Sequence, residues 1–265
     1  MSHSRLFREL HTQQQPLLIA NCWDPLSALV LEQSGAPAVA TTSWGMSNHQ
    51  GLVDGEKLTF EHVYNTVKAI LQVITIPLSV DIEAGYSDDH NEIITHVLAL
   101  AKLGVAGINI EDKPSSRESL RKTGEHQKLI RTLKAELHKH GFAEFFVNAR
   151  CDLCLQSSWQ KSQLYSRAKA YQDAGADGFF IPGLKDPAML VELTEQLIIP
   201  VNVMLLANFC DLEQLSELGI QRISTGNALS DHLLTQLESC AQALTNTKNL
   251  SFLFENNVQT RFISA

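Results

Sequence analysis

The sequence predicts a (β/α)8 barrel, the TIM-barrel fold, from three observations. Eight apolar runs are continuous rather than alternating, which is typical of parallel strands covered on both faces. Segments with helical periodicity separate these runs, and eight strands are the number that closes such a barrel. At four places a glycine ends a helical pattern just before a strand, as in βα repeats. The predicted strands are residues 17–22, 38–43, 78–83, 107–111, 145–150, 178–182, 201–205 and 222–226.

Helix signals occupy the intervals between these strands in order. Asp24 and Asp186 each precede a proline, a pattern in which an N-cap is followed by a first-turn proline. Apolar residues recur at helical spacing over residues 93–101 and 164–175. The glycines that end helical patterns before strands are Gly35, Gly104, Gly175 and Gly219. The chain therefore alternates strand and helix throughout.

A doubly wound open sheet is the alternative architecture. No G-x-G-x-x-G turn follows any predicted strand, and this absence disfavours a dinucleotide-binding sheet. Because no linker or low-complexity stretch divides the chain, we expect one domain over residues 1–265. A predicted C-terminal helical and apolar extension covers about residues 231–265, and we expect its apolar tail, residues 249–265, to pack on the barrel or on another subunit.

Composition excludes several classes of partner. The chain has 265 residues and a formal net charge of -8, so it lacks the clustered basic residues of a nucleic-acid-binding surface. No apolar run is long enough to span a membrane, and we expect a soluble cytoplasmic protein. The five cysteines are an odd number for a disulfide framework. Cys151 and Cys154 have redox or zinc spacing but lack further ligands, and we interpret them as structural.

Asp81 and Glu83 end the third predicted strand, and Gly85 turns the chain away after them. Side chains at i and i+2 of a strand point to the same face, so these two carboxylates are expected to converge. Convergent carboxylates repel unless they are protonated or bound to a cation, and oxygen ligands suit Mg²⁺. A solvated loop is the alternative interpretation of this D-x-E pair.

Polar residues also end most of the other predicted strands, where a barrel carries its chemistry. Glu111 is expected to share the ion with Asp81 and Glu83, partly through waters. Arg150 faces the same mouth and could bind a substrate carboxylate with its guanidinium fork, or it could pair with Asp152 or Glu111. A metal beside such a clamp suits a 2-oxo acid. The further strand-end residues are Asn21, Trp23, Asp24, Thr41, Thr42, Ser43, Asp112, Lys113, Asn202, Thr225 and Asn227.

Five segments at these strand ends carry recognisable motifs. They are Asn21–Ala28, Thr41–Ser43 with Gly51–Gly55, Asp81–Tyr86, Gly107–Lys113 and Asn148–Asp152. As an ordered set, they resemble the motifs of the phosphoenolpyruvate mutase/isocitrate lyase superfamily. The resemblance spans about residues 17 to 230. It implies a Mg²⁺-dependent barrel enzyme, with Mn²⁺ as a possible substitute, that makes or breaks a bond beside a 2-oxo acid through an enolate.

The resemblance also implies roles for individual residues. Asp81 would bind the metal directly, while Glu83 and Glu111 would hold metal-bound waters. Asp54 would support those waters or the catalytic loop. Apart from the resemblance, Lys113 directly follows two acids, so it either pairs with them or acts as an electrostatic stabiliser. Substrate would contact Arg150, the pocket of Thr42 and Ser43 with its backbone N–H groups, and the further candidates Trp23 and Asn202. Members of this superfamily exchange a C-terminal helix between subunits, which implies a homodimer or homotetramer.

Departures from the superfamily motifs limit the reactions that we expect of this chain. The Lys-Lys-Cys-Gly-His loop of isocitrate and methylisocitrate lyases is replaced by residues 114–119, and the Lys-x-Asn-Ser loop of phosphoenolpyruvate mutases is absent. Gly183 replaces the glutamate that such lyases carry after the sixth strand. We therefore expect a lyase for a small carboxylate, by decarboxylation or retro-aldol cleavage, with residues 115–117 on a gating loop. The alternatives are P–C bond chemistry on phosphonopyruvate and a non-catalytic metabolite-binding barrel.

Overall fold

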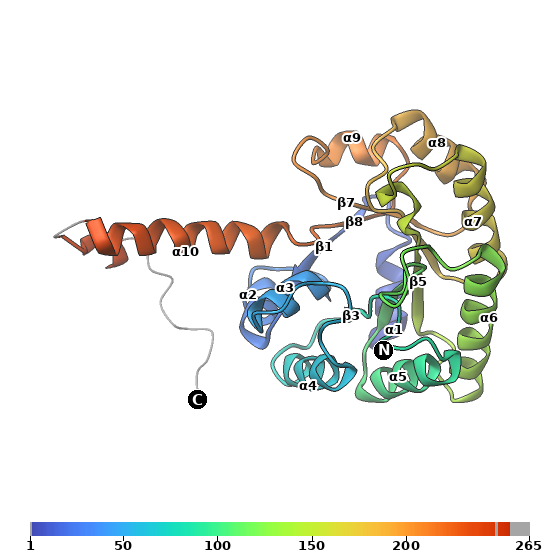
Figure 1. Ribbon diagram of the computed structural model, residues 1–265, viewed down its shortest axis with the longest axis horizontal. Coiled ribbons are helices and arrows are strands. Elements are labelled where there is room, and N and C mark those ends of the chain that lie inside the picture. The colour runs from blue at the N-terminus through green and yellow to red at the C-terminus, as the bar shows by residue number, and fades with distance from the viewer. Residues whose placement is uncertain (1, 247–248, 255–265) are drawn as a thin grey trace.

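The eight strands form one closed parallel barrel in chain order, as predicted (Figure 1). The structure is a computed structural model that describes residues 2–246 and 249–254. Each strand pairs in parallel with its neighbours, and β8 closes the barrel against β1. The strands are β1 (Leu17–Cys22), β2 (Val39–Thr41), β3 (Leu78–Asp81), β4 (Gly107–Glu111), β5 (Phe146–Arg150), β6 (Gly178–Phe180), β7 (Val201–Met204) and β8 (Arg222–Ser224).

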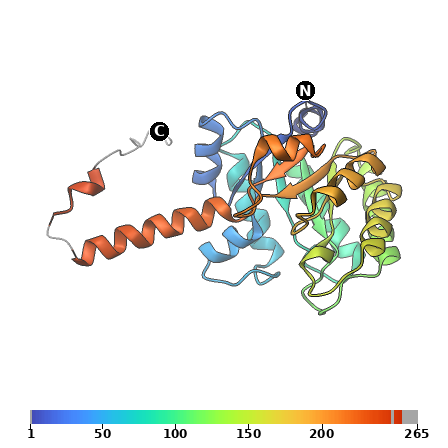
Figure 2. The same ribbon diagram turned by 90° about the horizontal axis from the view of Figure 1, so that it is seen from above.

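Helices surround the barrel and cover the outward faces of its strands (Figures 1 and 2). Both predicted N-caps are confirmed, since Asp24 caps α2 and Asp186 caps α8, each with proline in the first turn. The main hydrophobic core lies between strands and helices, where Val80 and Ile108 are buried. The helices are α1 (His3–Leu10), α2 (Pro25–Gln33), α3 (Ser43–His49), α4 (Phe60–Leu71), α5 (His90–Leu103), α6 (Thr123–Lys139), α7 (Lys161–Asp173), α8 (Pro187–Gln196), α9 (Leu212–Glu217) and α10 (Ala228–Asn246), with short 3-10 turns η1 (Asp152–Leu155) and η2 (Ser251–Phe254).

Helix α1 closes the end of the barrel at which the strands begin. Phe7 of α1 is fully buried and packs edge-to-face on Phe146 of β5, with ring centroids 5.5 Å apart. The guanidinium of Arg222 lies 5.5 Å from the centre of the Phe7 ring. This plug leaves the opposite end, where the strands terminate, as the open mouth that carries polar side chains.

Helix α10 leaves the barrel as a long arm in both views (Figures 1 and 2). Ser230 is its buried residue, whereas several of its leucines are exposed. The predicted extension from residue 231 therefore begins inside a helix that starts at Ala228, and residues 255–265 lie outside the described part of the chain. Exchange of this helix between subunits stays a prediction. Among the described residues, none of the helices combines the length and apolar character that a membrane span requires.

Candidate functional site

Four carboxylates gather at the mouth of the barrel. Asp81 and Glu111 are the last residues of β3 and β4, Glu83 follows β3, and Asp54 lies on the loop between α3 and α4. Burial, and then the charges of Asp54 and Asp81, raise the pKa of Glu83 to about 8. Burial and the charge of Asp81 also raise the pKa of Asp54. The acids singled out from the sequence therefore interact, and their mutual repulsion favours a bound cation.

Asp81 is the best-placed direct ligand of such a cation. Its carboxylate is buried, and its Oδ2 accepts a hydrogen bond of 2.9 Å from the hydroxyl of Ser43. Its backbone N–H donates to Oγ1 of Thr41 at 2.9 Å, which fixes the end of β3 against β2. Oδ1 of Asp81 is buried and has no hydrogen-bond partner. A buried carboxylate oxygen without a partner is costly, and a cation bound to this atom would offset that cost.

The predicted strand geometry of Glu83 is wrong, although its carboxylate does reach the acid cluster. Strand β3 ends at Asp81, and Glu83 has a φ of 48°, in the left-handed region. A tight turn follows, in which Gly85 has a φ of 109° and leaves no room for a Cβ against Ile93. Glu83 Oε2 accepts from the backbone N–H of Glu56 at 2.6 Å, and Oε1 accepts from the hydroxyl of Tyr86 at 3.1 Å. The turn, rather than strand alternation, places this carboxylate.

The raised pKa of Glu83 predicts an unusual dependence of stability on pH. Between its ordinary pKa of 4.5 and about 8, the folded protein holds a proton that the unfolded chain has released. Stability of the metal-free protein is therefore expected to fall as pH rises through this window, by up to about 1.4 kcal/mol per pH unit. Urea unfolding in EDTA at several pH values measures this slope, which Glu83→Gln should flatten. A slope that the substitution leaves unchanged would contradict the assignment.

Arg150 shows the ion pairing that was the alternative to a substrate clamp. Its Nε and Nη2 bind both oxygens of Asp152 at 2.6 and 2.9 Å, and its Nη1 lies 3.0 Å from Glu111 Oε2. The same Nη1 is 3.9 Å from Asp81 Oδ2. Arg150 therefore balances part of the negative charge of the mouth and orients Glu111. Direct contact with substrate stays a prediction for its Nη1 edge.

Lys113 points into its own loop. Its Nζ donates to the backbone carbonyls of Pro114 and Arg117, instead of forming the ion pair with Glu111 or Asp112 that was the alternative interpretation. These bonds curl the chain after β4 into a compact turn. A catalytic role for Lys113 stays a prediction.

The predicted anion pocket at Thr42 and Ser43 is only partly available. The backbone N–H of Thr42 donates to Cys22 at 2.9 Å, so it cannot serve an anion as expected. The side chain of Thr42 caps α3, and that of Ser43 bonds to Asp81. The indole N–H of Trp23 donates to His49 Nε2 at 3.1 Å. Of this group, Ser43 touches the acid cluster directly.

Asn202 lies inside the barrel rather than at its mouth, and contact with substrate stays a prediction for it. It is buried inside the barrel, where its Oδ1 accepts from Asn148 at 2.9 Å and its Nδ2 donates to Val203 O at 2.7 Å. Asn148 also bonds to Asn109, which accepts from Arg222 across the barrel. Asn202 therefore belongs to a polar layer within the barrel, below the mouth. Cys151 and Cys154 are free thiols, as expected.

Sequence reasoning placed Asp112 at the end of a strand but missed Arg121 and the buried partners of Asp112, which support the residues of the mouth. Asp112 is fully buried and accepts hydrogen bonds from Arg167 at 2.8 Å, Tyr171 at 2.6 Å and the backbone of Asp152 at 2.9 Å. Arg121 is also buried and donates to the carbonyls of Glu111 and Ala84 at 3.0 Å. No spacing signal in the sequence marks these long-range pairs. They fix the ends of β3, β4 and β5 relative to one another.

The acid cluster fits a hydrated magnesium ion better than a fully protein-bound one. Within residues 2–246 and 249–254, no three His, Cys, Asp or Glu side chains are arranged to bind one ion directly. Mg²⁺ usually keeps several waters and takes one or two carboxylates. The free Oδ1 of Asp81 could supply one direct ligand, and Glu83 and Glu111 lie close enough to interact with Asp81 through charge. A water-mediated site is therefore compatible with these residues.

Comparison with known proteins gives a consistent family. Residues 7–245 match the family described as phosphoenolpyruvate phosphomutase. An uncharacterized protein of Mycobacterium tuberculosis is 37% identical over 92% of this chain and 90% of its own length. The oxaloacetate decarboxylase of Pseudomonas entomophila is 27% identical over 84% of this chain and 78% of its own. The phosphoenolpyruvate phosphomutase of Streptomyces platensis shares the fold, with a TM-score of 0.79 and 22% identity over 95% of this chain and 93% of its own.

Proposed function

The chain belongs to the phosphoenolpyruvate mutase/isocitrate lyase superfamily, and we propose that it is a Mg²⁺-dependent lyase that cleaves a C–C bond of a small 2-oxo or 2-hydroxy carboxylate. The observation that carries the proposal is the buried, unpaired Oδ1 of Asp81 among four carboxylates. Decarboxylation of an oxaloacetate-like acid and retro-aldol cleavage are the favoured reactions, both through an enolate.

In this proposal, each residue of the mouth has a separate role. Asp81 would hold the ion directly, Glu83 and Glu111 would hold its waters, and Asp54 would support them from the rim. When bound, the ion would polarise the keto oxygen of the substrate and stabilise the charge that develops there. The Nη1 edge of Arg150, the one not held by Asp152, would contact the substrate carboxylate beside the hydroxyl of Ser43.

Two features support a small substrate. The loop after β4 carries serines and no Cys or His between residues 114 and 119. At Gly183, φ is 84°, a backbone conformation that residues with a side chain rarely adopt, so this position offers no side chain that would bind a second carboxylate. The loop would exclude water from the enolate when closed.

A second candidate function is P–C bond chemistry on phosphonopyruvate. The match of residues 7–245 to the family described as phosphoenolpyruvate phosphomutase favours it. The same acid cluster would serve either reaction, because both build negative charge on the oxygen of a 2-oxo acid. The two candidates differ in the bond that is broken and therefore in the product.

A substrate panel tests the proposal. The protein with Mg²⁺ is incubated with oxaloacetate, 2-methylisocitrate, dimethylmalate and phosphonopyruvate, and pyruvate, phosphate and phosphoenolpyruvate are measured against a blank of Mg²⁺ alone. We expect pyruvate from one of the first three, lost in EDTA and restored by Mg²⁺. Turnover of phosphonopyruvate alone would favour the second candidate. Turnover of none of the four, in a protein that binds the ion, would favour a metabolite-binding barrel.

A further inference from the structure

Backbone strain is concentrated beside the proposed metal site. The non-glycine residues with positive φ in the described chain are Glu56 at 56°, Glu83 at 48° and Tyr86 at 60°. Non-glycine residues in this region are strained, and they persist only where their surroundings hold them. The three residues also bond to one another, although Glu56 lies on a different loop from the other two. One set of contacts therefore holds all three.

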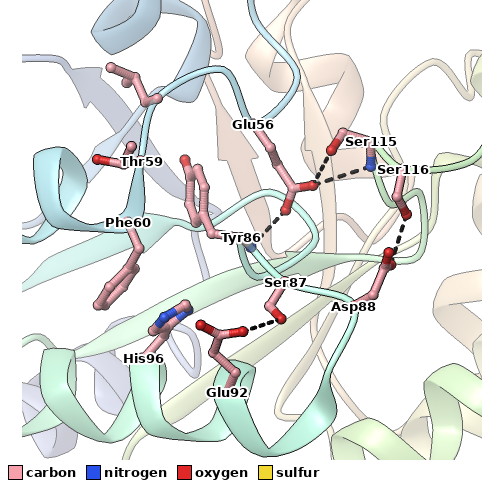
Figure 3. Close-up of a pocket in the computed structure, with 11 residues that line it drawn as sticks. Glu56, Thr59, Phe60, Tyr86, Ser87, Asp88, Glu92, His96, Ser115 and Ser116 are labelled. Carbon is pink, nitrogen blue, oxygen red and sulfur yellow. Dashed lines mark hydrogen bonds between the residues drawn. The ribbon is translucent and has the colours of Figure 1, made fainter.

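Glu56 makes most of these contacts (Figure 3). Its backbone N–H donates to Glu83 Oε2 at 2.6 Å, and its Oε1 accepts from the backbone N–H of Tyr86 at 2.7 Å. Its Oε2 accepts from both the N–H and the hydroxyl of Ser115, at 3.2 and 2.6 Å. Tyr86 completes the ring by donating its hydroxyl to Glu83 Oε1 at 3.1 Å. We call Glu56, Glu83, Tyr86 and Ser115 the Glu56 clasp.

The clasp joins three loops of the mouth. Glu56 comes from the loop before α4, Glu83 and Tyr86 from the turn after β3, and Ser115 from the loop of residues 112–122 between β4 and α6. Ser116 adds one contact to the same turn, since its hydroxyl donates to Asp88 at 2.8 Å. A cavity of about 380 Å³ borders Glu56, Ser115 and Ser116, so the Glu56 side chain has open space beside it if Ser115 moves away. Two of the contacts of Glu56 therefore depend on where the loop holds Ser115.

We propose that Glu56 is a positioning residue, which couples closure of the 112–122 loop to the alignment of the Glu83 carboxylate. When Ser115 engages Glu56, the side chain is fixed on Tyr86, and the strained backbone of Glu56 presents its N–H to Glu83. When Ser115 leaves, Glu56 loses two of its three side-chain bonds, and its backbone N–H is held less firmly on Glu83. This inference rests on the proposed function, in which Glu83 holds a metal-bound water.

Three variants distinguish this coupling from contacts that only stabilise the fold. Glu56→Gln keeps the size of the side chain but places an amide where the backbone and Ser115 donors point. Ser115→Ala removes the hydroxyl bond and keeps the N–H bond. Glu92→Gln is the matched control, because Glu92 lines the same cavity and accepts from Ser87 at 2.6 Å without touching the clasp (Figure 3). Circular dichroism and thermal melting verify that each full-length variant is folded.

The first readout is affinity for Mn²⁺, followed by titration without substrate. Residues that orient metal-bound groups typically change metal affinity by about 10- to 100-fold when replaced. We expect Glu56→Gln to weaken binding by at least about tenfold on this basis, Ser115→Ala to weaken it less, and Glu92→Gln to leave it within about twofold. If the wild type binds Mn²⁺ and Glu56→Gln binds it equally well, the inference fails while the proposed function stands. If the wild type binds none, both fail.

The second readout is cleavage of the loop by trypsin, which needs no metal. Trypsin does not cut efficiently after Lys113, because a proline follows it. Arg117 lies in the same loop and is partly exposed, so trypsin can cut after it when the loop is released. The amount of the fragment that ends at residue 117 therefore measures release of the loop. We expect Ser115→Ala to speed this cleavage by about fivefold, the effect of one net hydrogen bond, and Glu56→Gln to speed it more. Equal rates in these two variants and the wild type would overturn the coupling.

Discussion

Replacing Asp81 with alanine is expected to lower kcat/KM for the substrate of this protein by about 10³-fold or more. Within residues 2–246 and 249–254, Asp81 carries the one buried carboxylate oxygen at the mouth that lacks a partner, and it would be the direct ligand of the ion. Its loss also frees the hydroxyl of Ser43. Steady-state kinetics with saturating Mg²⁺ measure the effect, and Mn²⁺ titration measures the accompanying loss of affinity without substrate.

Asp173→Asn is the matched control for this change. Asp173 is an exposed residue at the end of α7 that pairs with Lys169, so its replacement should leave kcat/KM within about twofold, as expected of a surface change. Asp81→Asn keeps the shape of the side chain but loses the charge, and it should resemble Asp81→Ala more than the wild type. Activity that survives both Asp81 changes would show that Asp81 does not hold the ion.

The second large effect is on stability. Asp112→Ala is expected to lower the free energy of unfolding by about 3–5 kcal/mol, the usual result of removing one partner from a buried ion pair. The change leaves the side chain of Arg167 without its carboxylate and removes the acceptor of Tyr171 and of the Asp152 backbone. Because Asp152 holds Arg150, the mouth should lose activity as well. Urea unfolding followed by tryptophan fluorescence measures the difference.

Asp112→Asn helps to assign the cause of that loss. The amide keeps one of the two acceptor oxygens, replaces the other with a donor and cannot neutralise Arg167, so the comparison with Asp112→Ala shows how much stability the remaining acceptor restores. A loss below about 1 kcal/mol in Asp112→Ala would mean that water or a neighbouring group replaces the carboxylate, and the supporting role of Asp112 would be wrong.

The barrel itself was predictable because its signals are local. Continuous apolar runs, helix caps and glycines before strands depend on neighbouring residues, and they give β1 and β4 with the bounds that the structure shows. The predicted third strand ran two residues too long because Glu83 continues the apolar-acidic pattern while its backbone has already turned. The alternation of side chains along a strand does not predict that the backbone turns into the left-handed region at the end of that strand.

The details of the mouth depend on contacts between residues distant in sequence. Arg150 and Asn202 were placed on the correct strands, but whether their polar groups face substrate or protein depends on partners such as Glu111 and Asn148. Glu56 was passed over altogether, because one glutamate after a glycine carries no signal of the two loops that it joins. Sequence patterns located the candidate acids, and only the three-dimensional arrangement identified their partners.

The central claim is that the carboxylates at the mouth hold one divalent ion through Asp81. Anomalous diffraction from crystals of the protein grown with Mn²⁺ tests it most directly. We expect one strong peak within direct bonding distance of Oδ1 of Asp81, with Glu83 and Glu111 reached through waters. The absence of a peak at the mouth, or a peak bound by other residues with Oδ1 still unpaired, would contradict it.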